Sequence, residues 1–235
     1  HPSIAEGAYA IKQMGEKSGA YQAVFDNDPS RFHPDRIREF DAVCLNNTSG
    51  MITEEQELQQ GLLRFVREGG GLIGIHAATT TFCEYPVYDQ FPEFGAMLGG
   101  YENGGHPWGP DETILFQPEE PDHPINQPFD GNSFTLKEEV FQFKDHYSRD
   151  RLRVLLKIDT DQMDTGPDRR MLPERRADLD FAVSWIRREE KGRVFYCALG
   201  HNPAVFWQSN ILKHLLAGFQ YALGDLECDD APSHA

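Results

Sequence analysis

The sequence predicts an α/β protein with an open, mostly parallel sheet and helices on both faces. Three observations lead to this class. Residues Ile4 to Lys17 place apolar side chains three and four positions apart, which is typical of an amphipathic helix. Residues 41–46 and 72–75 are short apolar runs typical of buried strands. A helix predicted between these two strands gives the length that a parallel crossover requires.

The elements of the first third have recognisable ends. Ser3 precedes the first helix and is its predicted N-cap. A helix at this position implies a preceding strand, which would lie upstream of His1 and is absent from this sequence, so we expect His1 at the tip of a strand-to-helix loop. Thr53 and Gln56 have the spacing of a capping box and open the second helix, which the glycines at 69–71 end.

The remainder of the chain is irregular in the middle and regular towards its end. Prolines are frequent between residues 86 and 128, which excludes long helices there and indicates ordered loops. Residues 159–180 are charged and lack periodicity, so we expect an exposed excursion, and a hairpin is predicted over residues 182–199 around the turn Glu189 to Gly192. Further strands and a closing helix are predicted at residues 113–117, 139–143, 153–158 and 210–223. No internal repeat is present, and a single domain is predicted over residues 1–235.

The composition excludes several classes of partner. The net charge is −16, from 22 basic and 38 acidic residues, so nucleic acids and anionic membranes would be repelled. No apolar run approaches the roughly 18 residues of a membrane span, and no segment has the layout of a secretory signal. The four cysteines lie far apart and contain no CxxC pair, which gives no sign of a thiolate zinc site or a disulfide framework. The expected compartment is the cytoplasm or the periplasm of a bacterium. The composition is compatible with a homo-oligomer.

Three histidines occupy positions that predict a site. His76 and His201 each end a buried strand, and His106 follows two glycines in a loop. Because α/β proteins bind ligands at the carboxyl edge of their sheets, we expect these imidazoles to face a common crevice. Imidazoles gathered with a carboxylate suit a divalent cation such as zinc, nickel, manganese or iron. Glu139 is the predicted carboxylate, with Glu138 beside it pointing to the other face.

Each of these patterns has a structural alternative. The histidines can instead hydrogen-bond the backbone of neighbouring loops. Asn46, Asn47 and Thr48 follow a strand at the same predicted edge and are candidates for binding sugar hydroxyls, but a turn and a helix cap require the same residue types. Trp108 lies close to His106 in the sequence and is predicted as an aromatic wall of the site, although tryptophans also serve as core residues.

Signals for two other chemistries are absent from the sequence. There is no Gly-x-Cys-x-Gly or Gly-x-Ser-x-Gly turn, so covalent acyl chemistry lacks its nucleophile. There is also no GxxxxGK(S/T) phosphate loop and no GxGxxG after a strand, so a nucleotide cofactor is not indicated.

The sequence resembles the ThuA-like family, named after a trehalose-utilisation protein. The resemblance extends over nearly the whole chain and rests on the following motifs in this order: His1-Pro-Ser-Ile, Gly69-Gly-Gly-Leu-Ile-Gly-Ile-His76, Leu98-Gly-Gly through His106-Pro, Lys137-Glu-Glu-Val-Phe141, and Lys191-Gly-Arg-Val-Phe-Tyr with Leu199-Gly-His201. It implies a flavodoxin-like fold similar to that of class I glutamine amidotransferases.

The resemblance also relates His76 to a catalytic position in amidotransferases. Amidotransferases carry a catalytic cysteine at the strand-to-helix turn where this chain has His76, and their catalytic histidine near the C-terminus is similar in position to His201. The resemblance therefore implies that glutaminase activity is lost. The family pattern Asp-Glu-x-Tyr is matched here by Glu138-Glu139-Val140-Phe141, which keeps Glu139 and lacks the tyrosine hydroxyl.

A carbohydrate ligand follows from the family's links to the catabolism of trehalose and related disaccharides, including 3-keto sugars. We expect a metal-dependent enzyme that acts on a sugar or keto-sugar by hydrolysis, elimination or isomerisation. His76, His106, His201 and His1 are expected to surround a divalent cation, with zinc as the first candidate, and Glu139 or His201 to move the proton. The alternative is a sugar-binding or accessory protein without catalytic turnover.

Overall fold

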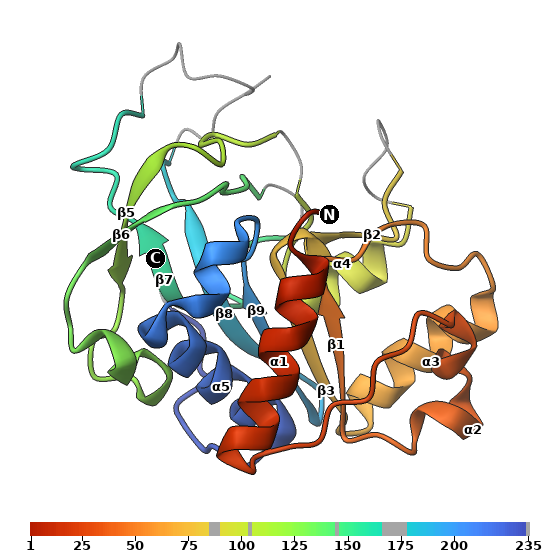
Figure 1. Ribbon diagram of the computed structural model, residues 1–235. Helices are drawn as coiled ribbons and strands as arrows, with labels where there is room; N and C mark the ends of the chain where they lie inside the picture. Colours follow the sequence, from red (N-terminus) through yellow and green to blue (C-terminus); the bar gives the residue numbers. More distant parts are fainter. Residues whose placement is uncertain (85–89, 103–104, 144–145, 166–177, 234–235) are drawn as a thin grey trace.

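A mixed sheet organises the protein in a computed structural model that describes residues 1–84, 90–102, 105–143, 146–165 and 178–233 (Figure 1). Its seven strands follow the order β1-β3-β9-β8-β7-β5-β6. The bounds of these strands are β1 Ala42–Asn46, β3 Gly71–Ile75, β5 Thr113–Pro118, β6 Phe134–Lys137, β7 Arg153–Ile158, β8 Ala182–Glu189 and β9 Gly192–Cys197. A short parallel pair, β2 Ser49–Gly50 with β4 Thr80–Thr81, lies beside the sheet.

The strands β1, β3 and β9 form the parallel part of the sheet. In their register Asn46 pairs with Ile75, and Ile75 pairs with Cys197. The three strands therefore finish at the same level, and the residues that follow them meet at one edge. Every residue of β3 is buried, as expected for a strand covered on both faces.

The prediction of a mostly parallel sheet is wrong, because the sheet is mixed. Strand β9 pairs antiparallel with β8, and the pairs β8–β7, β7–β5 and β5–β6 are antiparallel as well. The physical reason is visible at β8 and β9, which only Glu190 and Lys191 separate. A parallel connection needs a dozen or more residues, whereas two residues suffice for a hairpin. The predicted hairpin is confirmed by the pairing of Glu189 with Gly192.

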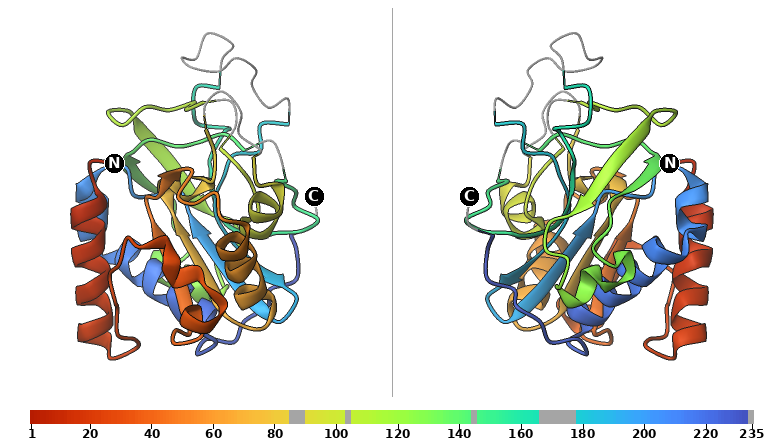
Figure 2. Two further views of the ribbon diagram at one scale, coloured as in Figure 1. Left: turned by 90° about the vertical axis from the view of Figure 1, so that its right-hand side faces the viewer. Right: turned by 90° about the vertical axis from the view of Figure 1, so that its left-hand side faces the viewer.

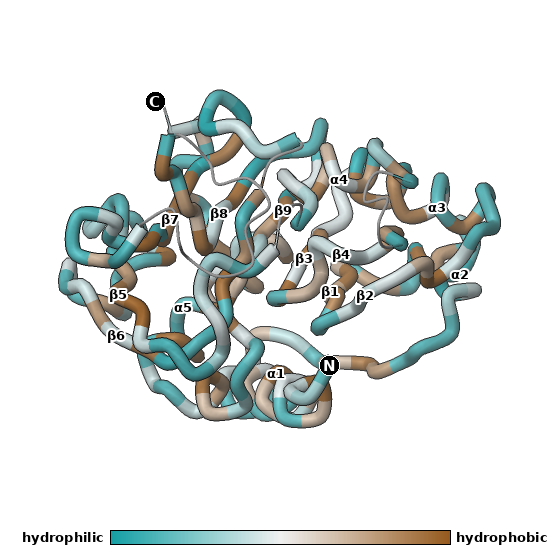
Figure 3. Tube along the Cα trace, turned by 90° about the horizontal axis from the view of Figure 1, so that it is seen from above, coloured by the Kyte–Doolittle hydropathy of each residue, from teal (hydrophilic) through white to brown (hydrophobic). Residues whose placement is uncertain are grey.

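Helices cover both faces of the sheet, as predicted. Helices α1 and α5 lie together on one face, and α3 and α4 lie on the other (Figures 1 and 2). Seen from above, apolar stretches follow several of the strands between these layers (Figure 3). The helices are α1 Ile4–Ser18, α2 Pro34–Ile37, α3 Gln56–Arg67, α4 Pro92–Leu98 and α5 Ser209–Leu223, and the short 3-10 helices are η1 Pro29–Phe32, η2 His76–Thr79, η3 Pro124–Phe129 and η4 Pro203–Trp207. No helix in the described part of the chain combines the length and apolarity needed to cross a bilayer.

Two predicted helix caps are wrong in their contacts. Ser3 stands at the N-cap of α1, but its hydroxyl donates to the carbonyl of Gly200 and makes no capping hydrogen bond. Helix α3 begins at Gln56, and the Thr53 hydroxyl accepts a hydrogen bond from the Glu55 N–H ahead of it. In the first case a long-range contact has replaced the local one, and it ties the start of α1 to the loop after β9.

The segment predicted as a strand at 139–143 is a second correction. It contributes two isolated antiparallel bridges, Val140 to Trp108 and Phe143 to Glu102, and no regular strand. The four consecutive residues 140–143 are all buried, and Glu139 is partly buried. This path carries Glu139 to the ends of β3 and β9. The predicted excursion at 159–180 lies in part, at residues 166–177, outside the described residues.

The burial of His214 in α5 makes the stability of the protein depend on pH. Its ring is fully buried, with its two nitrogens 3.0 Å from the Ser184 hydroxyl and 3.0 Å from the Ile125 carbonyl. Burial lowers the pKa of His214 to about 4. Between pH 6.5 and pH 4 the unfolded chain therefore binds a proton that the folded chain excludes, and stability falls as the pH falls.

We predict that replacing His214 by Gln flattens this part of the stability profile. The wild-type free energy of unfolding should lose about 3 kcal/mol between pH 6.5 and pH 4 through His214 alone, at 1.36 kcal/mol for each pKa unit. Urea unfolding at a series of pH values measures the loss. The half-exposed His33 provides the comparison variant, His33→Gln, because the burial that excludes a proton from His214 is missing there. Parallel profiles for wild type and His214→Gln would contradict this account.

Candidate active site

A sharp turn places His76 at the end of β3. The strand ends at Ile75, and η2 begins with His76 without an intervening loop. The φ angle of His76 is 44°, in the left-handed region that residues with a Cβ seldom adopt. Such a conformation costs about 1–3 kcal/mol and persists where the surroundings hold it. The strand-to-helix turn predicted from the sequence is therefore present and carries an imidazole at its tip.

Contacts from β9 and the loop after it hold this turn. The Tyr196 hydroxyl donates to the His76 carbonyl at 2.7 Å, and the His76 Nδ1 lies 2.6 Å from the Ala198 carbonyl. Gly200, at φ 145°, lets the loop pass so close that a Cβ there would lie 3.3 Å from the His76 Cβ. The turn is thus fixed by the strand that pairs with β3.

The environment of His76 defines its protonation. Because the Ala198 carbonyl can only accept, Nδ1 carries the hydrogen and Nε2 presents a lone pair. Burial lowers the pKa of His76 to about 3, so its ring is neutral at physiological pH. Nε2 is buried and lies 3.8 Å from the Glu139 carboxylate, and no hydrogen-bond partner for it is found among the described residues.

Four histidines from distant parts of the chain converge on Glu139 or on one another. The Nε2 atoms of His76 and His106 lie 3.8 and 3.6 Å from Glu139 Oε1, and His201 Nε2 lies 3.8 Å from Glu139 Oε2. The His1 ring centroid is 4.9 Å from that of His76 and 4.7 Å from that of His201. The structure therefore brings together every histidine predicted for the site, with the predicted carboxylate at their centre.

These side chains surround a cavity of about 350 Å³ at the carboxyl edge of the parallel strands. Its volume is at the lower end of the range for small-molecule sites, ~300–1,000 Å³. The described lining residues contain two carboxylates and neither lysine nor arginine. They are His1, Ser49, His76, Ala77, Thr80, Cys83, Glu102, His106, Glu139, Phe141 and His201.

Phe141 closes one side of the cavity at the position where the family pattern has tyrosine. Its ring centroid lies 4.4 Å from that of His76 and 5.0 Å from that of His106. The ring therefore packs between two of the imidazoles, and it adds no hydroxyl group to the cavity.

Glu102 is a lining residue that the sequence analysis missed. Its side chain is buried, and one carboxylate oxygen accepts the Gly105 N–H at 2.9 Å. Burial raises the pKa of Glu102, while the nearby His106 lowers it. Glu102 follows no recognisable strand or helix pattern in the sequence, so nothing local pointed to it.

Glu138 is a second residue whose importance the sequence concealed. Its carboxylate is fully buried and accepts the backbone N–H groups of His201 at 2.8 Å, Asn202 at 3.2 Å and Glu139 at 3.1 Å. Burial raises the pKa of Glu138 to about 8, against the opposing effect of these donors. The expectation that Glu138 points away from Glu139 agrees with these contacts, which hold the loop of His201.

The residues predicted to bind substrate do not line the cavity. The Asn46 and Asn47 amides donate to the Ile4 carbonyl at 3.0 Å and the Ser3 hydroxyl at 3.3 Å, and the Thr48 hydroxyl pairs with that of Thr81. Trp108 is fully buried, with its ring edge-on to Phe181 at 5.0 Å. Among the described residues, Ser49 and Thr80 are the hydroxyl groups at the cavity, joined to each other at 2.9 Å.

The donor atoms suit a divalent cation without forming a finished site. Two atoms that bind one zinc ion at ~2.1 Å lie about 3.4 Å apart at the tetrahedral angle, so separations of 3.6 and 3.8 Å are a few tenths of an ångström longer. Within the described ranges, no group of three or more His, Cys, Asp or Glu side chains is already arranged to hold a metal ion. The arrangement supplies imidazole nitrogens, one carboxylate that three of them face and a second buried carboxyl group.

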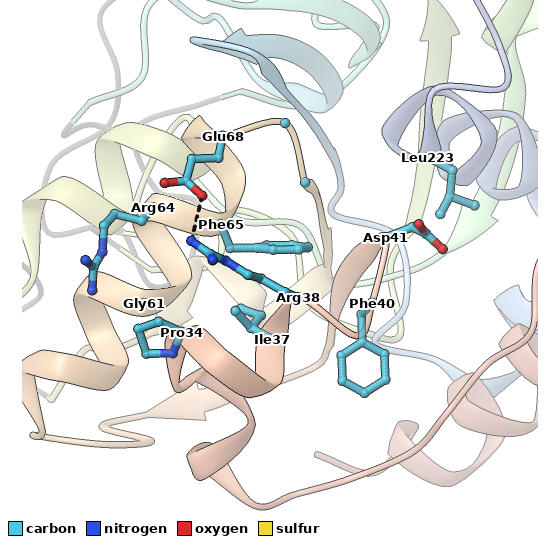
Figure 4. A pocket seen from close by; sticks show the side chains of 12 residues that line it. Pro34, Ile37, Arg38, Phe40, Asp41, Gly61, Arg64, Phe65, Glu68 and Leu223 are labelled. Carbon is cyan, nitrogen blue, oxygen red and sulfur yellow. Dashed lines mark hydrogen bonds and ion pairs between the residues drawn. The ribbon is translucent and has the colours of Figure 1, made fainter.

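A second cavity, of about 400 Å³, lies at the opposite edge of the sheet (Figure 4). It is bordered by α2, α3 and the residues that precede β1 and β3. Its charged groups include Arg38 and Glu68, which form an exposed ion pair at 3.3 Å. Exposed pairs of this kind are screened by water and contribute little. The charged side chains among its described lining residues, which are Arg38, Asp41, Arg64 and Glu68, are all exposed, unlike the buried polar groups of the first cavity.

The sequence matches the model of the family ThuA, described as trehalose utilisation, over residues 1–222. No match is found among curated proteins. The fold is similar to that of a ThuA-like protein from Bacteroides uniformis, with a TM-score of 0.72, 19% identity, and coverage of 94% of this chain and 86% of that one. It is also similar to a ThuA-like protein from Parabacteroides merdae (TM-score 0.64, 16% identity, 95% and 91% covered) and to cytoplasmic protein STM3548 from Salmonella typhimurium (0.61, 13%, 92% and 87%).

The support of the His76 turn by Tyr196 gives a prediction about stability. Tyr196→Phe removes the hydroxyl and leaves the buried His76 carbonyl without its donor, which should cost about 1–3 kcal/mol of unfolding free energy. Urea denaturation measures the difference. Tyr9→Phe is the matched control, because Tyr9 is 55% exposed and should be neutral. Equal losses in the two variants would show that the hydroxyl of Tyr196 does not hold the turn.

Proposed function

This chain belongs to the ThuA family of trehalose utilisation, and we propose that it is a metal-dependent enzyme of carbohydrate catabolism that acts on a sugar or keto-sugar. The observation that carries the proposal is the buried, unpartnered Nε2 of His76, aimed at a carboxylate that two further imidazoles also face. Leaving a buried polar atom without a hydrogen bond costs about 1–3 kcal/mol, so a lone pair of this kind calls for a ligand.

The residues around this lone pair fit a borderline divalent cation. His76, His106 and His201 supply imidazole nitrogens and Glu139 an oxygen, a donor set that suits zinc first and nickel, manganese or iron next. The hydrogen bond from His76 Nδ1 to Ala198 fixes the ring in the orientation and tautomer that a ligand needs. A cation held by these side chains would supply Lewis acidity to a carbonyl or water beside it.

Two side chains of the cavity, Glu139 and His201, can transfer the proton that the reaction requires. Glu139 has a side chain 16% exposed to solvent, so it can both touch the cation and exchange a proton with a bound molecule. His201 is the second proton carrier. Its Nδ1 lies 3.3 Å from the Asn202 Oδ1, and its Nε2 faces Glu139 across the cavity. Whichever of the two does not bind the cation moves the proton in a hydrolysis, elimination or isomerisation.

The charge of the cavity supports an uncharged ligand. The described lining carries the carboxylates of Glu102 and Glu139 and no basic side chain except imidazoles. A phosphate or carboxylate group on the substrate would meet this field without an arginine or lysine to pair with. A neutral sugar, which offers hydroxyl and carbonyl groups, suits the lining better, with Ser49 and Thr80 as hydrogen-bonding partners at the rim.

The cation is tested by metal analysis of protein purified without an affinity tag. We expect about one divalent ion per chain in the wild type, and roughly 100-fold weaker binding in His76→Ala because the pre-oriented donor is lost. His33→Ala removes an exposed histidine far from the cavity and should bind as the wild type does. A wild-type protein that takes up no divalent ion would refute the proposal.

Turnover is tested with a panel of disaccharides and their 3-keto derivatives, following product by mass spectrometry. Glu139→Gln should lower kcat by about 10²–10⁴ for the active member of the panel, since proton transfer by a side chain contributes that much. Asp159→Asn, remote from the cavity, is the control. Ligand-induced thermal stabilisation with no product from any member would favour the sugar-binding or accessory protein instead.

A further inference from the structure

Glu138 is a buried carboxyl group whose hydrogen-bond partners, within the described part of the chain, are backbone N–H groups. Its side chain is fully excluded from solvent, and within the described residues it forms no ion pair with lysine, arginine or histidine. Removing a carboxyl group from water costs free energy that its hydrogen bonds must offset. An apolar side chain would fill the same volume without this cost, so stability alone does not account for a glutamate here.

The three donors to this carboxylate come from both sides of the cavity. Oε1 accepts the N–H of His201 at 2.8 Å and the N–H of Glu139 at 3.1 Å, so a single atom joins the backbones of the two residues. Asn202 N–H adds contacts of 3.2 and 3.3 Å to the two oxygens. The consecutive N–H groups of His201 and Asn202 both point at this carboxyl group, directly after Gly200 with its φ of 145°.

A further contact ties the same loop to the chain that carries Glu138. The Asn202 side chain donates to the carbonyls of Pro110 at 2.7 Å and Lys137 at 2.8 Å. The loop after β9 is therefore joined to the segment before Glu139 by side-chain and backbone bonds together. The Glu138 carboxyl group contacts the loop, while the Glu139 carboxylate faces the histidines.

We propose that Glu138 is a positioning residue, whose carboxyl group holds Glu139 and His201 at a fixed separation beside the cation site. The inference rests on the proposed function and assigns this residue no contact with the cation or the substrate. It acts through the backbone of its two neighbours in space. Loss of groups that orient metal ligands typically weakens metal binding 10–100-fold, which sets the expected size of the effect.

The test uses calorimetric titration of metal-free protein with zinc chloride alone. Glu138→Met keeps the shape and removes both acceptors, and it should raise the Kd for zinc about 10–100-fold. Glu138→Gln retains an acceptor oxygen for the N–H groups of His201 and Glu139, so its Kd should stay within about threefold of the wild-type value. Asp159→Ala, a nearly buried carboxylate away from the cavity, is the matched control and should not change the Kd.

The outcomes separate this inference from the proposed function. Tight zinc binding by wild type and equally tight binding by Glu138→Met would overturn the inference and leave the proposed function standing. Absence of zinc binding by wild type would overturn both. If Glu138→Met does not fold, the test compares Glu138→Gln with Glu138→Ala. Equal Kd values for zinc in these two variants would contradict a role through the backbone N–H groups. A Glu138→Gln variant that binds zinc as weakly as His76→Ala would contradict it as well.

Discussion

The site depends on one constraint, the parallel pairing of β3 with β9 in a register that places Ile75 opposite Cys197. That register brings the two chain segments to the same edge, where His76 turns into the left-handed region and donates to the Ala198 carbonyl beyond β9. The hydrogen bond leaves Nε2 as a neutral lone pair facing the cavity. A shift of one residue would turn alternate side chains to the other face and separate these groups.

Hydrogen bonds from buried polar groups hold the other residues of the site in place. The Tyr196 hydroxyl supports the His76 carbonyl, the Ser3 hydroxyl ties the start of α1 to Gly200, and Glu138 joins the backbones of Glu139 and His201. The side chains that face the cavity come from segments spread along the chain from His1 to His201. Their convergence rests on this layer of hydrogen bonds, because loops without such bonds would not hold imidazoles within 4 Å of one carboxylate.

Much of this arrangement could be predicted from the sequence, and the reasons for the remainder are physical. His76 and His201 follow apolar runs with strong strand patterns, and the edge of a parallel sheet brings such residues together, so their meeting was predictable. The mixed sheet, the bridges at 139–143, and the roles of Glu102 and Glu138 depend on long-range contacts that leave no local period. Asn46, Asn47 and Ser3 show the converse case, since residue types suited to binding or capping are used in contacts between loops. Their predicted roles toward substrate stay predictions.

The central claim is that imidazoles distant in the chain share one cation with Glu139. Anomalous diffraction at the zinc edge, from crystals of the tag-free protein soaked in zinc chloride, tests it most directly. The account predicts a single strong peak within ~2.2 Å of His76 Nε2 and of a Glu139 oxygen. A saturated soak that leaves this cavity empty, with zinc bound only at exposed groups such as His33 and Glu57, would contradict it.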